Sequence, residues 1–154
     1  MIQKHIYDRG DFMKAVLWII WQATWCLPQN LAGLILLLLH RRERHFRFHG
    51  AIVTPWDHRG CTSLGAFIFI DRHAVRDRPL LVHEYGHTVQ SAVLGALYLP
   101  VISLPSMLWY SLPALRKYRR RTHRSYYSFY TERWANRWGE KACKERSMGM
   151  AHID

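Results

Sequence analysis

Apolar residues fall into three stretches that polar and basic residues separate. Residues 15–39 carry no charged side chain, residues 50–70 are rich in β-branched and aromatic side chains, and residues 92–115 are again apolar. As a helix, residues 15–39 would be about 37 Å long, enough to cross a hydrocarbon core of about 30 Å. We therefore expect an N-terminal transmembrane segment, kinked at Pro28, or a re-entrant hairpin.

The middle stretch predicts strands. Residues 50–56 and 63–70 flank the polar sequence Asp57-His58-Arg59-Gly60, which favours a β-hairpin. With helices before and after it, the expected fold is α+β and mostly helical, with a small β-hairpin or sheet and membrane-embedded apolar helices. We expect one membrane-associated domain over residues 1–154, with the catalytic part in residues 50–145.

Two helices are expected after the strands. Asp77 can cap the first helix and Pro79 suits its first turn, because a missing N–H costs nothing there. This helix is expected to continue to about Tyr98. Pro100, Pro105 and Pro113 then interrupt the apolar stretch, so residues 101–112 predict a short helix that lies in or dips into the membrane.

The chain is strongly basic, with a net charge of +11 and 17 Arg among its 22 basic residues. The basic clusters 40–47 and 116–124 adjoin apolar segments, which favours contact with anionic lipid headgroups and places both clusters on the cytoplasmic side. No nucleic-acid-binding module is visible, so no nucleic-acid partner is expected. Three widely spaced cysteines predict neither a disulfide framework nor a Cys-based metal site.

The first expected helix carries the sequence His83-Glu84-Tyr85-Gly86-His87, an H-E-x-x-H motif. Residues four apart share a helix face, so His83 and His87 can bind one metal ion at about 2.0 to 2.1 Å. Glu84 lies about 100° round the helix and is placed to activate a metal-bound water instead of serving as a ligand. Gly86 lies between the ligands, where a side chain would obstruct the substrate or another backbone.

A second polar motif lies 45 residues after His87, in a stretch that predicts a helix. Glu132, Asn136 and Gly139 share one face of it. Glu132 could supply a third metal ligand, and the amide oxygen of Asn136 could accept a hydrogen bond from the far nitrogen of a ligand histidine.

H-E-x-x-H followed by E-x-x-A-[D/N]-x-x-G resembles the gluzincin metallopeptidases, and most closely their membrane branch, the CAAX prenyl proteases and the HtpX-like metallopeptidases. The resemblance covers about fifteen motif residues. It implies Zn²⁺ held by His83, His87 and Glu132, with Glu84 as the general base. The chain departs from the family at Asn136, where an Asp is usual, and it is much shorter than those relatives.

The resemblance also implies that an edge strand binds the substrate in extended form, and the candidate is Ser63-Leu64-Gly65-Ala66-Phe67. A buried core hairpin is the alternative for this segment. Gluzincins further require a Tyr, His or Arg to stabilise the oxyanion, and Tyr130, Tyr127 and His123 are candidates. The remaining histidines lie in polar or basic surroundings and are not expected to be ligands.

The sequence therefore predicts a zinc-dependent integral membrane peptidase whose active site faces the cytoplasm and whose substrates are small membrane or precursor peptides. The alternative is a non-catalytic membrane adaptor or pseudoprotease that keeps the zincin fold. A chance H-E-x-x-H in a metal-free membrane protein is a third reading, because ten His in 154 residues raise the odds of a random match.

Overall fold

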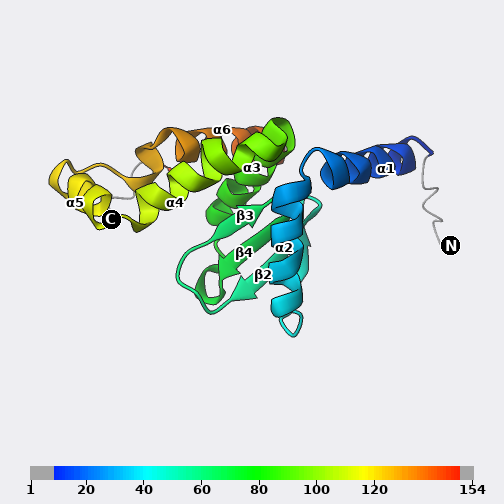
Figure 1. The fold of residues 1–154 in the computed structure, drawn as a ribbon, viewed down its shortest axis with the longest axis horizontal. Coiled ribbons are helices and arrows are strands. Elements are labelled where there is room, and N and C mark those ends of the chain that lie inside the picture. Colours follow the sequence, from blue (N-terminus) through cyan, green and yellow to red (C-terminus); the bar gives the residue numbers. More distant parts are fainter. Residues whose placement is uncertain (1–8, 150–154) are drawn as a thin grey trace.

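The computed structural model describes residues 9–149, which form an α+β fold that is mostly helical (Figure 1). The elements are α1 (Arg9–Thr24), α2 (Leu27–Leu39), β1 (Phe46–Phe48), β2 (Ala51–Trp56), β3 (Thr62–Leu64), β4 (Phe67–Asp71), α3 (Arg78–Leu94), α4 (Leu104–Ser111), α5 (Pro113–Arg121) and α6 (Tyr130–Cys143). In Figure 1, α3, α4 and α6 form a layer above the sheet, while α1 and α5 extend to opposite ends of the molecule. The predicted fold class, mostly helical with a small sheet, is confirmed.

The four strands form one mixed sheet in the order β1-β2-β4-β3. β1 pairs antiparallel with β2, and β3 pairs antiparallel with β4. The two central strands are parallel, with Val53 opposite Ile68. The predicted hairpin between residues 50–56 and 63–70 is therefore wrong, because these two segments do not run antiparallel to each other.

Gly65 explains this difference. Its φ of +63° lies in the left-handed region, which favours glycine, and it turns the chain between β3 and β4. Residues 63–70, expected to form one strand, thus lie in two antiparallel strands, β3 and β4. After this turn, β4 runs parallel to β2. The second hairpin, β1–β2, turns in the same way at His49 and Gly50, which both have positive φ.

The turn at Gly65 also divides the predicted substrate-binding strand. Ser63 and Leu64 belong to β3, at one edge of the sheet, whereas Gly65 and Ala66 form the turn. Phe67 begins β4, which lies between β2 and β3. A continuous edge strand over residues 63–67 is therefore wrong.

Helices cover both faces of the sheet. Alternate residues of the two central strands pack with α3, forming a buried core that comprises Phe48, Ala51, Val53, Ile68, Ile70, Leu81, Val82 and Cys143. On the other face lies α2, whose Gly33 is so close to β4 that an added Cβ would come within 2.6 Å of the Phe67 ring. Figure 1 shows α2 crossing the sheet on that side.

Helix α2 is joined to its neighbours by buried side-chain amides. Gln29 is fully buried and its Nε2 donates to Ser91 Oγ at 3.0 Å and to the Gly95 carbonyl at 2.8 Å, both at the end of α3. Asn30 Oδ1 accepts from the Ala66 N–H at 2.8 Å in the β3–β4 turn. We call these two amides the α2 latch, since they bond to distant parts of the chain.

The first apolar stretch is not one helix. The chain breaks at Trp25 and Cys26, between α1 and α2, and Pro28 lies in the first turn of α2 as its fixed φ allows. Within residues 9–149, no single helix has both the length and the apolarity to cross a membrane. Two pairs of consecutive helices, over residues 12–39 and 78–111, are long and apolar enough when the two helices of each pair are taken together. The helices of these pairs are bent by 93° and 119°, respectively.

The second bend comes from the end of α3. This helix stops at Leu94, four residues before the predicted end at Tyr98, because Gly95 adopts a φ of +57°. A wider helical turn over Leu99–Ser103 then leads into α4. The expected short helix over residues 101–112 thus corresponds to α4 together with this turn.

Candidate metal centre

Helix α3 presents the two histidines of the motif. The Asp77 side chain caps the helix by accepting from the Leu80 N–H at 3.1 Å, and Pro79 lies in the first turn, as predicted. Because His83 and His87 are one turn apart, their rings lie side by side with centroids 4.9 Å apart. Both are buried, at 2% and 7% exposure.

Glycines let α6 approach α3 at backbone distance. A Cβ added to Gly86 would lie 1.9 Å from the carbonyl oxygen of Ala135, and one added to Gly139 would lie 2.1 Å from that of Val82. Neither helix can accept a larger side chain at these points unless its backbone moves. We call this contact the glycine crossing, and it holds the start of α6 against the two histidines.

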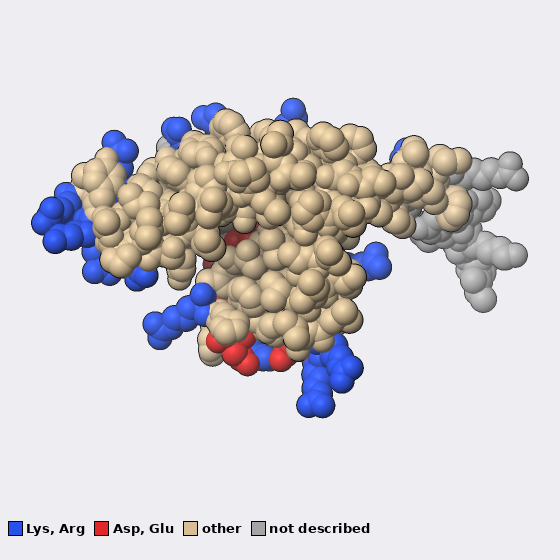
Figure 2. All heavy atoms as spheres, in the orientation of Figure 1, with Lys and Arg blue, Asp and Glu red and all other residues tan. Residues whose placement is uncertain are grey.

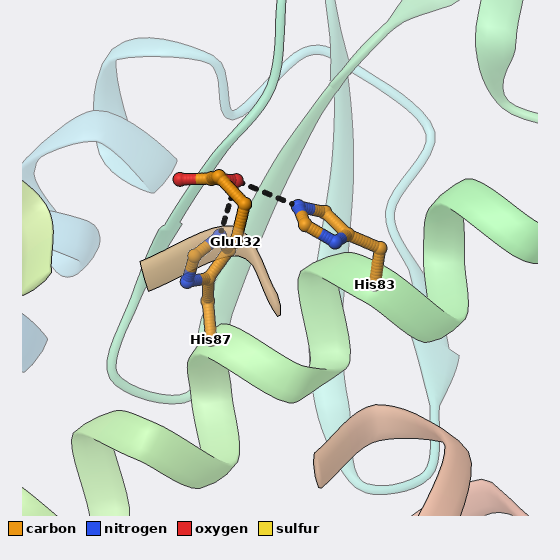
Figure 3. A group of neighbouring side chains, drawn as sticks. All are labelled: His83, His87 and Glu132. Carbon is orange, nitrogen blue, oxygen red and sulfur yellow. Dashed lines mark hydrogen bonds and ion pairs between the residues drawn. The ribbon is translucent and has the colours of Figure 1, made fainter. Parts of the chain in front are cut away.

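The crossing brings Glu132 onto the histidine pair. Glu132 Oε2 lies 3.1 Å from His83 Nε2 and 3.4 Å from His87 Nε2, and Figure 3 shows both rings directed at the carboxylate. Ligand atoms of a tetrahedral zinc site with bonds of 2.0 to 2.1 Å are about 3.4 Å apart. The two distances are therefore compatible with a metal ion between the three side chains, whose ligand atoms all lie within 4.8 Å of one another. Among residues 9–149 this is the one group of three such side chains with converging ligand atoms.

The charges of the cluster also suit a cation. Burial alone would raise the pKa of the Glu132 carboxyl, but the charge of His87 and a hydrogen bond from His83 hold this pKa well below its ordinary value. Burial would lower the pKa of His87, yet the Glu132 carboxylate outweighs burial and raises it to about 9. A proton on His87 thus balances the buried carboxylate of Glu132, and a divalent cation can take that proton's place.

Both histidines are oriented by amide oxygens. His83 Nδ1 lies 2.8 Å from Asn136 Oδ1, and His87 Nδ1 lies 2.7 Å from Gln90 Oε1. An amide oxygen can only accept, so each Nδ1 donates and each Nε2 is left to face the cluster. Sequence reasoning singled out Asn136 but missed Gln90. Gln90 follows His87 by three residues and shares its helix face, and this spacing could have indicated the contact.

Hydroxyl groups fix the carboxylate of Glu132. Its Oε1 accepts from Ser106 Oγ at 2.5 Å and from Thr131 Oγ1 at 2.9 Å. These bonds occupy one oxygen and leave Oε2 to face the imidazoles. Ser106 belongs to α4, which no sequence motif connects to the site, so its role could not be predicted.

Glu84 lies beside the cluster and does not belong to it. It is buried, and its Oε2 accepts from Ser63 Oγ at 2.8 Å, so the edge strand β3 holds the carboxylate in place. Glu84, His83, His87 and Glu132 all line one cavity of about 680 Å³. The cluster and a buried carboxylate outside it therefore share a space large enough for several residues of a peptide.

The candidate oxyanion stabilisers are placed differently from one another. Tyr127 lines the cavity, and its ring centroid is 5.1 Å from that of His83. Tyr130 lies outside the cavity lining and donates its hydroxyl to the Val101 carbonyl at 2.6 Å. His123 is exposed and also lies outside the lining. Of the three, only Tyr127 is in a position to meet a substrate bound in the cavity.

We compared the chain with known proteins by sequence and by fold. No family model matches it, and neither a curated protein nor a solved structure is significantly similar to it. The resemblance to gluzincins therefore stays a prediction that rests on the motif residues.

Proposed function

We propose that the protein is a zinc-dependent peptidase with His83, His87 and Glu132 as zinc ligands. The observation that carries this proposal is the convergence of two imidazole nitrogens and a carboxylate oxygen at zinc-ligand spacing, on the wall of a cavity that Glu84 also lines. A purely structural zinc site is closed by four protein ligands and has no use for a nearby base. Three ligands plus a carboxylate are typical of a catalytic site.

The chemistry divides between the metal and the chain. A zinc ion bound here would polarise the scissile carbonyl and make water acidic enough to attack at neutral pH. Glu84 accepts the proton of the attacking water and passes it to the leaving amine. Ser63 keeps the Glu84 carboxylate in position through its 2.8 Å hydrogen bond. Tyr127, beside His83, is our candidate for stabilising the charge that develops on the carbonyl oxygen.

The edge strand supplies a way to hold the substrate. β3 lies at the edge of the sheet, and its residues Thr62 and Ser63 line the cavity. An extended peptide can pair with the outward backbone groups of such a strand. The Ser63 carbonyl already accepts from the Tyr98 hydroxyl at 2.9 Å, so a peptide would pair beside this contact. This pairing would place a peptide bond near Glu84, which contacts β3 through Ser63.

The first test is the metal content of the full-length protein, purified in detergent without chelator. We expect about one zinc per chain, because three protein ligands build one open site. Glu132→Gln should lower the zinc content sharply, since the amide removes the anionic ligand. Glu140→Gln, the same change further along α6, should bind zinc as the parent does. Equal zinc in the two variants would refute the assignment of the ligands.

We further propose that the protein is attached to a membrane through an apolar surface of α1, α2 and α4. Large apolar side chains on these helices are exposed, among them Leu17, Ile20, Leu31, Ile35, Leu38, Leu39, Leu104 and Met107. An apolar surface this extensive is costly in water. Basic residues follow α2 at one end of this surface, where they suit the headgroups of anionic lipids.

Charged substitutions on α2 test this attachment. The parent is expected to float with liposomes and to resist carbonate extraction. Leu31→Asp combined with Leu38→Asp should release it, because each carboxylate costs about 2.5 to 3.5 kcal/mol when placed in hydrocarbon. His73→Asp adds the same charge at an exposed site just after β4 and should leave flotation unchanged. Flotation of the double variant at the parental level would show that this surface does not face lipid.

A further inference from the structure

The cavity extends beyond the metal cluster into a strongly basic region. Figure 2 shows atoms of Asp or Glu at the base of a hollow between the helical layer and the sheet, and atoms of Lys and Arg gathered at the α5 end. The lining of this cavity includes five arginines, namely Arg59, Arg116, Arg119, Arg120 and Arg124. We call this set the arginine arm. Arg59 lies in the loop before β3, Arg124 lies in the loop after α5, and the other three belong to α5.

The acidic residues of the lining do not balance these charges. They are Asp71, Glu84 and Glu132, and the last two belong to the candidate metal centre. Four members of the arm, Arg59, Arg116, Arg120 and Arg124, form no salt bridge with any carboxylate of residues 9–149. Elsewhere in the molecule arginines do pair, as Arg78 does with Glu145 at 2.6 Å.

Arg119 shows that the arm is built into the fold. Its side chain is 5% exposed, and its guanidinium lies over the rings of Trp109 at 5.1 Å and Tyr126 at 5.6 Å. It also donates a hydrogen bond to the carbonyl of Trp109. Stacking on aromatic rings fixes the plane of this guanidinium in the cavity wall.

We propose that the arginine arm binds carboxylates of the peptide whose bond is cleaved at the metal centre, so that the substrate class is acidic peptides. The proposal rests on the peptidase function proposed above. Guanidinium groups bind carboxylates through two parallel hydrogen bonds, which suits both Asp and Glu side chains and a free C-terminus. Because the arm lines the same cavity as Glu84, its ligand occupies the space that the substrate must also occupy.

Paired peptides test this proposal with the zinc-loaded, full-length protein. One peptide carries Glu residues on both sides of the cleaved bond, and its partner carries Gln. Versions with free and amidated C-termini separate the two sources of the carboxylate. We expect kcat/KM to favour the acidic peptide by about tenfold or more, the usual worth of one or two charge-assisted hydrogen bonds, mainly through KM.

Substitutions in the arm should remove this preference. Arg116→Gln combined with Arg120→Gln is expected to bring the ratio of the two kcat/KM values close to one. Arg120→Glu should favour a Lys-containing peptide instead. Arg133→Gln combined with Arg137→Gln removes the same charge from the exposed side of α6 and should keep the parental ratio. An unchanged ratio in the Arg116/Arg120 variant would overturn the proposal.

A binding measurement separates failure of this proposal from failure of the peptidase function. In the Glu84→Gln background, fluorescence anisotropy of the labelled peptides should show about tenfold tighter binding of the acidic one. That result supports the arm even if the parent cleaves nothing, whereas equal binding overturns it even if the parent cleaves peptides. The Arg116→Gln, Arg120→Gln variant should also be tested for binding to phosphatidylserine vesicles. If it loses vesicle binding and keeps the parental preference for the acidic peptide, the arm binds lipid headgroups and the proposal is overturned.

Discussion

Replacing Glu84 by Gln is expected to lower kcat for peptide cleavage by about 10²- to 10⁴-fold, the usual contribution of a positioned general base. Gln keeps the size of the side chain and can still accept from Ser63, so the cavity should keep its shape. Zinc should remain bound, because Glu84 is not among the three converging ligands. Cleavage kinetics and zinc content measured on the same preparation check both expectations.

Glu43→Gln is the matched control, since Glu43 pairs with Arg72 on the surface and lies outside the cavity lining. It should cleave peptides as the parent does. If Glu84→Gln holds zinc and still supports the protein's cellular role, catalysis is not that role. The non-catalytic membrane adaptor would then replace the peptidase as the better account of the chain.

Gly86→Ala is expected to destabilise the protein by about 3 kcal/mol or more, at the upper end of the range for overpacked sites. The added methyl would lie 1.9 Å from the Ala135 carbonyl oxygen, and a backbone atom cannot rotate away as a side chain can. The helices must separate, and Glu132, one turn before Ala135, must then leave the histidines. The free energy of unfolding, measured with denaturant, and the zinc content should therefore both fall.

Arg137→Ala provides the comparison on α6, because its side chain is exposed and away from the crossing. Its effect on the free energy of unfolding should stay within about 0.5 kcal/mol. A Gly86→Ala protein as stable as this control, with full zinc content, would mean that α3 and α6 are not in backbone contact.

Local sequence spacing was enough to find each half of the candidate metal centre, whereas the pairing of the two halves was expected from the resemblance to gluzincins. His83 and His87 lie four residues apart, Asn136 follows Glu132 by the same interval, and helical periodicity alone puts each pair on one face. The capping of α3 by Asp77 was equally local. These features depend on a few neighbouring residues, so no knowledge of the rest of the chain was needed.

Features that depend on distant contacts were missed. Whether β4 would run parallel or antiparallel to β2 depended on the turn at Gly65, and a glycine in a strand-like sequence does not reveal its φ. The hydrogen bond from Ser63 to Glu84 follows from that same turn, because it brings β3 to the edge beside α3. Ser106 reaches Glu132 only through the path of α4, which proline spacing alone could not define.

The α2 latch couples the docking of α2 on α3 to the orientation of the candidate metal ligand His87. Gln29 bonds to Ser91, and the preceding residue, Gln90, holds the imidazole of His87. Docking of α2 therefore orders the same turn of α3 that orients a metal ligand. Because linkage is reciprocal, whatever free energy α2 docking contributes to zinc affinity, bound zinc must return to α2 docking. If zinc occupies the proposed site, its removal would therefore loosen the contact between α2 and the end of α3.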